Sequence, residues 1–158
     1  MLLFKGPRDQ LLSPLQAVCG IVEKRHTLPI LSNVLMEKNG EKLTLLATDI
    51  EIQITTQTPT QGAEKASMTV GARKMQDILR SLPESAEVSL TLDDKRLQLK
   101  AGKSRFNLQT LPAEDFPRMA TSDGQASRLS LTQKQMKRLL GLVQYAMAQQ
   151  DIRYYLNG

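Results

Sequence analysis

The sequence contains no tryptophan, one cysteine and one histidine in 158 residues, and aromatic residues make up only 4% of it. The single cysteine, Cys19, excludes an internal disulfide and is typical of a reducing compartment, which in a bacterium is the cytoplasm. No apolar run approaches the roughly 18–20 residues that cross a bilayer, and the first residues lack the long apolar core of a signal peptide. We therefore expect a cytoplasmic protein without a membrane partner, and a core of aliphatic side chains.

The same scarcity leaves few ways to build a catalytic site. Cys19 lies on the apolar face of a predicted helix, where an inert core thiol is favoured over a nucleophile. His26 has no serine or cysteine nucleophile motif beside it. Asp49 and Glu51 lie two apart on a predicted strand and could share a metal ion, although no third ligand is evident. We expect no metal and no cofactor.

The charge of the chain is basic and uneven. The formal net charge is +5; residues 1–122 hold 16 Lys and Arg against 14 Asp and Glu, whereas residues 123–158 hold 5 against 2. A basic balance permits a polyanionic partner without requiring one.

The apolar pattern predicts one order of elements twice: strand, helix, three strands. Leu11, Leu15 and Val18 recur at helical spacing in the first helix, which also contains Pro14. Asn39-Gly40 between two β-rich runs predicts a hairpin. The expected strands are 2–5, 33–37, 42–47, 51–58, 66–70, 87–92, 96–101 and 104–110, and the expected helices are 8–22 and 72–82.

A third copy of this order begins near the end of the sequence. We expect a strand at 128–131, an N-cap at Thr132, a helix at 133–147 and a strand at 152–156. A shift of 125 positions aligns this copy with the first one without a gap: Gln10 with Gln135, Leu11 with Met136, Leu15 with Leu140, Val18 with Val143 and Leu31 with Leu156.

The repeats predict the domain organisation and the fold class. Residues 1–122 form a complete domain, 123–126 a linker, and 127–158 the truncated start of a second domain. Strand–helix–three-strand units imply antiparallel sheets with helices packed on one face, an α+β arrangement.

Five separated blocks carry a family resemblance that covers the whole chain in order. They resemble the sliding clamps, the β subunits of bacterial DNA polymerase III, which implies the DNA clamp fold. The blocks are Thr27–Asn33, Ala47–Glu51, Ser104–Phe106, Leu111–Pro117 and Gln150–Gly158.

The resemblance implies DNA contacts at four residues and a partner site at a fifth. Arg25 and its repeat counterpart Gln150 match positions that touch DNA in the family, as does the aromatic pair Tyr154 and Tyr155. Tyrosine can stack on an exposed base, although a strand pair with one ring in the core remains an alternative. Leu156 matches a position in the cleft where clamp-binding peptides dock.

The resemblance also implies an interface between protomers. Phe106 and Leu108 would form its apolar centre, with basic residues facing acidic ones across the seam; alternatively, both face the domain's own core, with Arg105 solvated. The interface residues implied are Lys74, Arg96, Lys103, Arg105, Phe106 and Leu108.

The implied function is non-catalytic. Sliding clamps are processivity factors: two protomers join head to tail as a ring that encircles duplex DNA, slides on it and tethers the polymerase. The implied partners are double-stranded DNA, a second copy of the protein, the catalytic subunit of DNA polymerase III and the clamp loader. Two alternatives stay open: a metal-dependent phosphate-handling enzyme that uses Asp49 and Glu51, and a replication interaction module that does not encircle DNA.

Overall fold

The computed structural model describes residues 1–22, 28–94, 96–119 and 129–148. The chain divides into two compact units, Met1–Ala120 and Thr121–Gly158.

The first unit contains the helices and strands in the predicted order, with an additional 3-10 helix. Its strands are β1 (Leu2–Pro7), β2 (Asn33–Asn39), β3 (Lys42–Thr48), β4 (Gln53–Pro59), β5 (Lys65–Gly71), β6 (Glu87–Asp93), β7 (Arg96–Ala101) and β8 (Ser104–Leu111). Its helices are α1 (Arg8–Cys19), the short 3-10 helix η1 (Pro29–Ser32) and α2 (Ala72–Ser81). The expected β2–β3 hairpin is confirmed, because Asn39 pairs with Lys42 and Gly40 takes the left-handed φ of 62° that the turn requires.

The two repeats exchange their first strands. The strands of the described residues form one antiparallel sheet in the order β1-β6-β7-β8-β5-β2-β3-β4. Strand β1 of the first repeat therefore pairs with β6 of the second, and β5 of the second pairs with β2 of the first. Neither repeat is a separate sheet, so the repeats fold as one domain.

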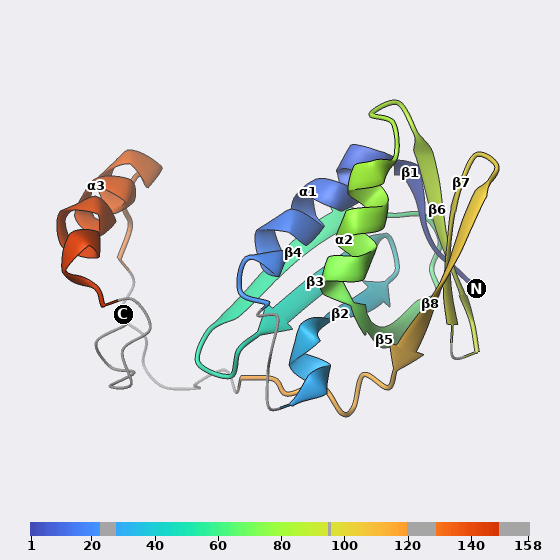
Figure 1. The fold of residues 1–158 in the computed structure, drawn as a ribbon, viewed down its shortest axis with the longest axis horizontal. Coiled ribbons are helices and arrows are strands. Elements are labelled where there is room, and N and C mark those ends of the chain that lie inside the picture. Colours follow the sequence, from blue (N-terminus) through green and yellow to red (C-terminus); the bar gives the residue numbers. More distant parts are fainter. Residues whose placement is uncertain (23–27, 95, 120–128, 149–158) are drawn as a thin grey trace. The chain divides into compact units, whose positions relative to one another are not determined.

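Both long helices lie side by side on one face of the sheet (Figure 1). Helix α1 fully buries Leu11, Leu15 and Val18 at helical spacing, and α2 fully buries Met75 and Leu79. These side chains share one core with the inward residues of both sheet halves. The expected α+β arrangement with helices on one face is confirmed.

Pro14 lies inside α1 and is tolerated because a side chain of the neighbouring strand β4 supplies the hydrogen-bond donor that the proline lacks. A proline has no N–H, so the carbonyl of Gln10 one turn earlier loses its helical donor, at a cost of roughly 3 kcal/mol in an isolated helix. The buried hydroxyl of Thr58 on β4 donates to that carbonyl at 2.8 Å, and Thr56 donates to the carbonyl of Pro14 at 3.1 Å. The proline site therefore fixes α1 against β4.

A buried lysine joins β2 to the edge strand β1. The Lys38 side chain is fully buried; its ammonium donates to the carbonyl of Leu2 at 3.2 Å and to that of Gln61, and it lies 3.8 Å from the Glu64 carboxylate. The hydroxyl of Thr60 donates to the carbonyl of Leu3 at 2.7 Å. These side chains satisfy β1 carbonyls, since buried polar groups need partners.

The opposite face of the sheet carries a second, smaller apolar cluster. Leu35 and Leu46 point away from the helices and are covered by Phe116, which is 4% exposed. Phe116 belongs to the segment Leu111–Met119, which starts at the last residue of β8 and which we call the strap. The sequence pattern did not single out Phe116, because a single aromatic residue among prolines and charged residues has no apolar periodicity.

The second unit is described over residues 129–148. Helix α3 (Gln133–Val143) starts with a capping box: the Thr132 hydroxyl accepts from the Gln135 N–H at 3.3 Å, and the Gln135 side chain accepts from the Thr132 N–H at 2.9 Å. The predicted N-cap is confirmed. The helix ends four residues earlier than expected and continues as the 3-10 turn η2 (Gln144–Ala146).

One predicted element in this unit is wrong. The part of the expected strand 128–131 that the structure describes, residues 129–131, is not a strand. A strand requires a hydrogen-bonded neighbour, and α3 and η2 are the regular elements described in this unit. The expected strand 152–156 lies outside the described residues.

The proline site in α1 gives a stability prediction. Replacing Thr58→Val leaves the partly buried Gln10 carbonyl without this donor and should lower the free energy of unfolding by about 1 kcal/mol in urea denaturation. The exposed Thr55 on the same strand is the control, and Thr55→Val should change stability by less than about 0.5 kcal/mol. In a Pro14→Ala background the helix N–H returns, so Thr58→Val should cost less; an undiminished cost would contradict this account.

Candidate nucleic-acid interface and protomer edge

The expected DNA contacts and the partner-cleft residue lie outside the described residues. These are Arg25, Gln150, Tyr154, Tyr155 and Leu156. Their roles stay predictions of the family resemblance.

The helical face of the first unit has an uneven charge. The solvent-exposed positions of α1 are Asp9, Ser13, Gln16 and Ala17, and none of them is a cation. The exposed positions of α2 include Arg73, Lys74 and Arg80 with a single acid, Asp77. Within the helices of this unit, the positive charge available to a polyanion therefore comes from α2.

Helix α3 repeats the basic pattern in the second unit. Lys134, Lys137 and Arg138 are all exposed, at the i, i+3 and i+4 spacing that places side chains on one helix face. Sequence reasoning did not single out these cations or Arg73 and Arg80. Helical spacing of basic residues is the signal that could have found them.

Strand β8 has an open edge in the described part of the chain. Residues Ser104–Gln109 pair with β7 on one side. On the other side, β5 pairs only with Thr110 and Leu111, through Val70 and Thr69. The strand therefore leaves backbone groups of Ser104–Gln109 available to another strand.

The six predicted interface residues separate into three locations. Arg96, Lys103 and Arg105 are exposed on the β7–β8 hairpin, and Lys74 is exposed on α2. Phe106 is partly buried and packs against the core, whereas Leu108 is 2% exposed and belongs to this domain's own core. Phe106 and Leu108 do share one face of β8, and Arg105 takes the other, as the alternation predicts.

Asp49 and Glu51 do not lie together on a strand, so that expectation is wrong. Strand β4 begins only at Gln53, and Asp49–Ile52 is a tight turn. The Asp49 carboxylate accepts from the N–H groups of Glu51 at 3.0 Å and Ile52 at 2.7 Å. Asp49 therefore acts as a turn-stabilising side chain, and among the described residues no three His, Cys, Asp or Glu groups gather to hold a metal ion.

This turn contains a residue in a strained conformation. Ile50 has a φ of 83°, which is rare for a β-branched residue, and its side chain is 53% exposed. The Thr48 hydroxyl accepts from the Ile50 N–H at 3.0 Å and donates to the Ile52 carbonyl at 2.7 Å. The alternation of Ile52 and Ile54 had suggested a longer strand, but the side-chain hydrogen bonds of Thr48 and Asp49 favour the turn.

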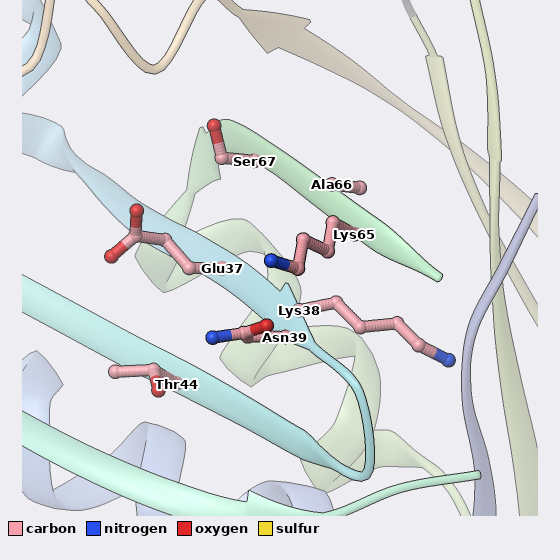
Figure 2. A pocket seen from close by; sticks show the side chains of 7 residues that line it. All are labelled: Glu37, Lys38, Asn39, Thr44, Lys65, Ala66 and Ser67. Carbon is pink, nitrogen blue, oxygen red and sulfur yellow. The ribbon is translucent and has the colours of Figure 1, made fainter. Parts of the chain in front are cut away.

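A shallow cavity of about 430 Å³ opens on the face of the sheet opposite the helices (Figure 2). The Lys38 side chain extends away from it in Figure 2, toward the carbonyls that it binds. Glu37 is paired with Arg118 of the strap at 2.8 Å. Two charged side chains of the cavity lining, Lys38 and Glu37, therefore already have partners within the first unit. The cavity is lined by Glu37, Lys38, Asn39, Thr44, Lys65, Ala66 and Ser67.

The Cys19 thiol is part of the core. It is 6% exposed, and burial raises the pKa of the thiol above its ordinary value, partly offset by the nearby Arg73 and Arg80. A raised pKa keeps the sulfur protonated and a poor nucleophile. The expected place of Cys19 in the core is confirmed.

Together, the exchanged first strands, the helices on one face and the antiparallel sheet define a DNA-clamp fold. The family model that describes the DNA polymerase III beta subunit, N-terminal domain, matches residues 2–120. The chain belongs to the DNA polymerase III beta subunit family.

Curated relatives and solved structures agree with this assignment. The chain is 47% identical over 156 residues to the beta sliding clamp of Pseudomonas putida and 45% identical over 157 residues to that of Escherichia coli K12. Each match covers 98% of this chain and 42% of the relative, so the chain spans less than half the length of these proteins.

Solved structures of this family are also similar to the chain, and the chain again covers less than half of each. The DNA polymerase III subunit beta from Pseudomonas aeruginosa superposes with a TM-score of 0.90 at 45% identity, covering 100% of this chain and 43% of that one. The pol III beta of Caulobacter crescentus gives a TM-score of 0.90 at 42% identity, covering 100% and 42%. No helix among the described residues is long and apolar enough to cross a membrane.

The Asp49 turn gives a prediction that separates a structural carboxylate from a metal ligand. Asp49→Ala removes two backbone hydrogen bonds and should lower the free energy of unfolding by about 1 kcal/mol, equally with and without Mg²⁺ in urea denaturation. Glu51→Ala, at an exposed position of the same turn, is the control. If Mg²⁺ stabilised the unaltered chain but not the Asp49→Ala variant, Asp49 would be a metal ligand and the purely structural role would be contradicted.

Proposed function

We propose that this chain forms part of a processivity factor of replicative DNA polymerase, a non-catalytic cytoplasmic subunit that acts in DNA replication. In this proposal it is the first domain, residues 1–122, and the start of the second, residues 127–158, of a head-to-tail dimeric ring around duplex DNA. The ring slides on DNA and tethers the polymerase, which raises the effective concentration of the enzyme at the primer end. Its partners are duplex DNA, a second protomer, the catalytic subunit of DNA polymerase III and the clamp loader.

The observation that carries this proposal is the DNA-clamp fold itself, at a TM-score of 0.90 to a solved DNA polymerase III subunit beta. A ring must enclose DNA without binding any sequence, so it needs cations on exposed helices rather than side chains that read base edges. Exposed Arg73 and Arg80 on α2 and exposed Lys134 and Lys137 on α3 fit that need. The exposed face of α1 carries Asp9 and no cation, so this helix adds no attraction for phosphates; weak attraction suits sliding.

The residues outside the described part complete the proposed DNA surface. We assign Arg25 and Gln150 to phosphate contacts and the Tyr154–Tyr155 pair to stacking on exposed bases. Leu156 would line the cleft for clamp-binding peptides. These roles rest on the family resemblance of their sequence blocks.

The open edge of β8 supports the proposed protomer interface. A second protomer would add a strand along Ser104–Gln109, next to the exposed cations Arg96, Lys103 and Arg105, and Lys74 would add charge from α2. Phe106, partly buried, would bury its remaining surface there. Leu108 supports the strand from the core side rather than from the seam.

The topological prediction needs a closed ring. We would replace the matching part of the Pseudomonas putida beta sliding clamp by residues 1–158 of this chain and load the chimera on DNA with the relative's clamp loader. The chimera should stay on closed circular DNA and leave the same DNA after linearisation at equal salt, because enclosure rather than affinity holds it. Equal retention on both DNAs would contradict encirclement and favour a non-encircling interaction module.

The interface prediction concerns dimer strength in the same chimera. Phe106→Ala should raise the dimer dissociation constant by at least about tenfold, since truncated aromatic hot spots typically cost more than about 1.4 kcal/mol. Gln16→Ala, at an exposed position of α1, is the matched control and should leave the constant unchanged. Sedimentation measures both, and an unaltered Phe106→Ala dimer would remove β8 from the interface.

A further inference from the structure

The strap, Leu111–Met119, is attached to the sheet at successive points on the face opposite the helices. Leu111 pairs with Thr69 on β5, where the strap begins. Phe116 then covers Leu35 on β2 and Leu46 on β3.

Two polar contacts continue the attachment beyond Phe116. The Arg118 guanidinium donates to the Glu37 carboxylate of β2 at 2.8 and 3.4 Å. The Met119 N–H donates to the side-chain oxygen of Gln53 on β4 at 3.1 Å. The strap thus crosses from β5 to β4 before the first unit ends at Ala120.

The strap's attachment is separate from the main core. Phe116, Leu35 and Leu46 form their own small cluster, supported by partly buried Ile30 and Ala113, and share no buried member with the core under the helices. The Glu37 and Arg118 side chains are 31% and 49% exposed. A segment held by one small cluster and one partly exposed ion pair can open locally at a free energy below that of global unfolding.

We propose that the strap is a releasable anchor that sets where the connection between the two units begins. While the strap is attached, the connection starts after Met119. When the strap opens, residues 112–119 join the connection and lengthen its reach by roughly 26 Å, at about 3.3 Å per extended residue. Phe116 and the Glu37–Arg118 pair therefore control the freedom between the units, a role that goes beyond DNA binding and dimerisation.

The rate of trypsin cleavage after Arg118 in the 158-residue chain measures this opening, because trypsin needs an extended substrate segment that is detached from the sheet. Phe116→Ala should speed cleavage after Arg118 by at least about tenfold, because opening no longer exposes an apolar ring. Glu37→Gln removes the ion pair without touching the apolar cluster and should speed the same cleavage severalfold. Glu114→Gln, at an exposed strap position, should not change it.

Cleavage after Lys100, within β7, separates local opening from loss of the fold. The proposal predicts that Glu37→Gln and Phe116→Ala change the rate after Arg118 much more than the rate after Lys100. Equal acceleration at both sites would mean global destabilisation and would overturn the anchor. So would cleavage after Arg118 in the unaltered chain at the rate of the urea-unfolded chain.

Discussion

The short pairing between β5 and β8 is the interaction on which the rest of the first unit depends. Two residue pairs, Thr69 with Leu111 and Val70 with Thr110, join the two halves of the sheet into one. Because the repeats have exchanged β1 and β5, each half contains strands from both, and the helices can cover a single shared core. The shortness of the pairing also matters, since it leaves Ser104–Gln109 open at the edge.

The other boundary between the halves uses side chains instead of a strand ladder. Lys38 and Thr60 satisfy the carbonyls of Leu2 and Leu3, so β1 is held without a second neighbouring strand. The two boundaries therefore differ: one leaves an edge open along β8, and the other closes its edge with buried polar contacts. Only the first is suited to strand addition by another chain.

Much of this fold could be predicted from periodicity, because apolar alternation and helical spacing are local signals. The helix faces of Leu11 and Met75, the hairpin at Asn39-Gly40 and the cap at Thr132 all follow from neighbouring residues. The exchange of β1 and β5 could not be predicted in this way, because it depends on contacts between residues far apart in the sequence.

The candidate site was less accessible to the same reasoning. The alternation of Ile52 and Ile54 predicts a strand that starts at Glu51, yet the Asp49 carboxylate accepts from the N–H groups of Glu51 and Ile52 and stabilises a turn there. Phe116 gave no periodic signal, since one buried ring in a strap has no repeat to reveal it. The roles of Arg25 and Tyr154 came from family resemblance, because isolated polar residues carry no pattern of their own.

The proposed ring requires a second protomer to cover the open edge of β8. Amide hydrogen exchange in the chimera, measured across concentrations that span dimerisation, tests this claim most directly. The account predicts that amides within Ser104–Gln109 exchange much more slowly in the dimer, while amides of β3, inside the sheet, keep their rates. A dimer that forms without slowing exchange along Ser104–Gln109 would contradict it.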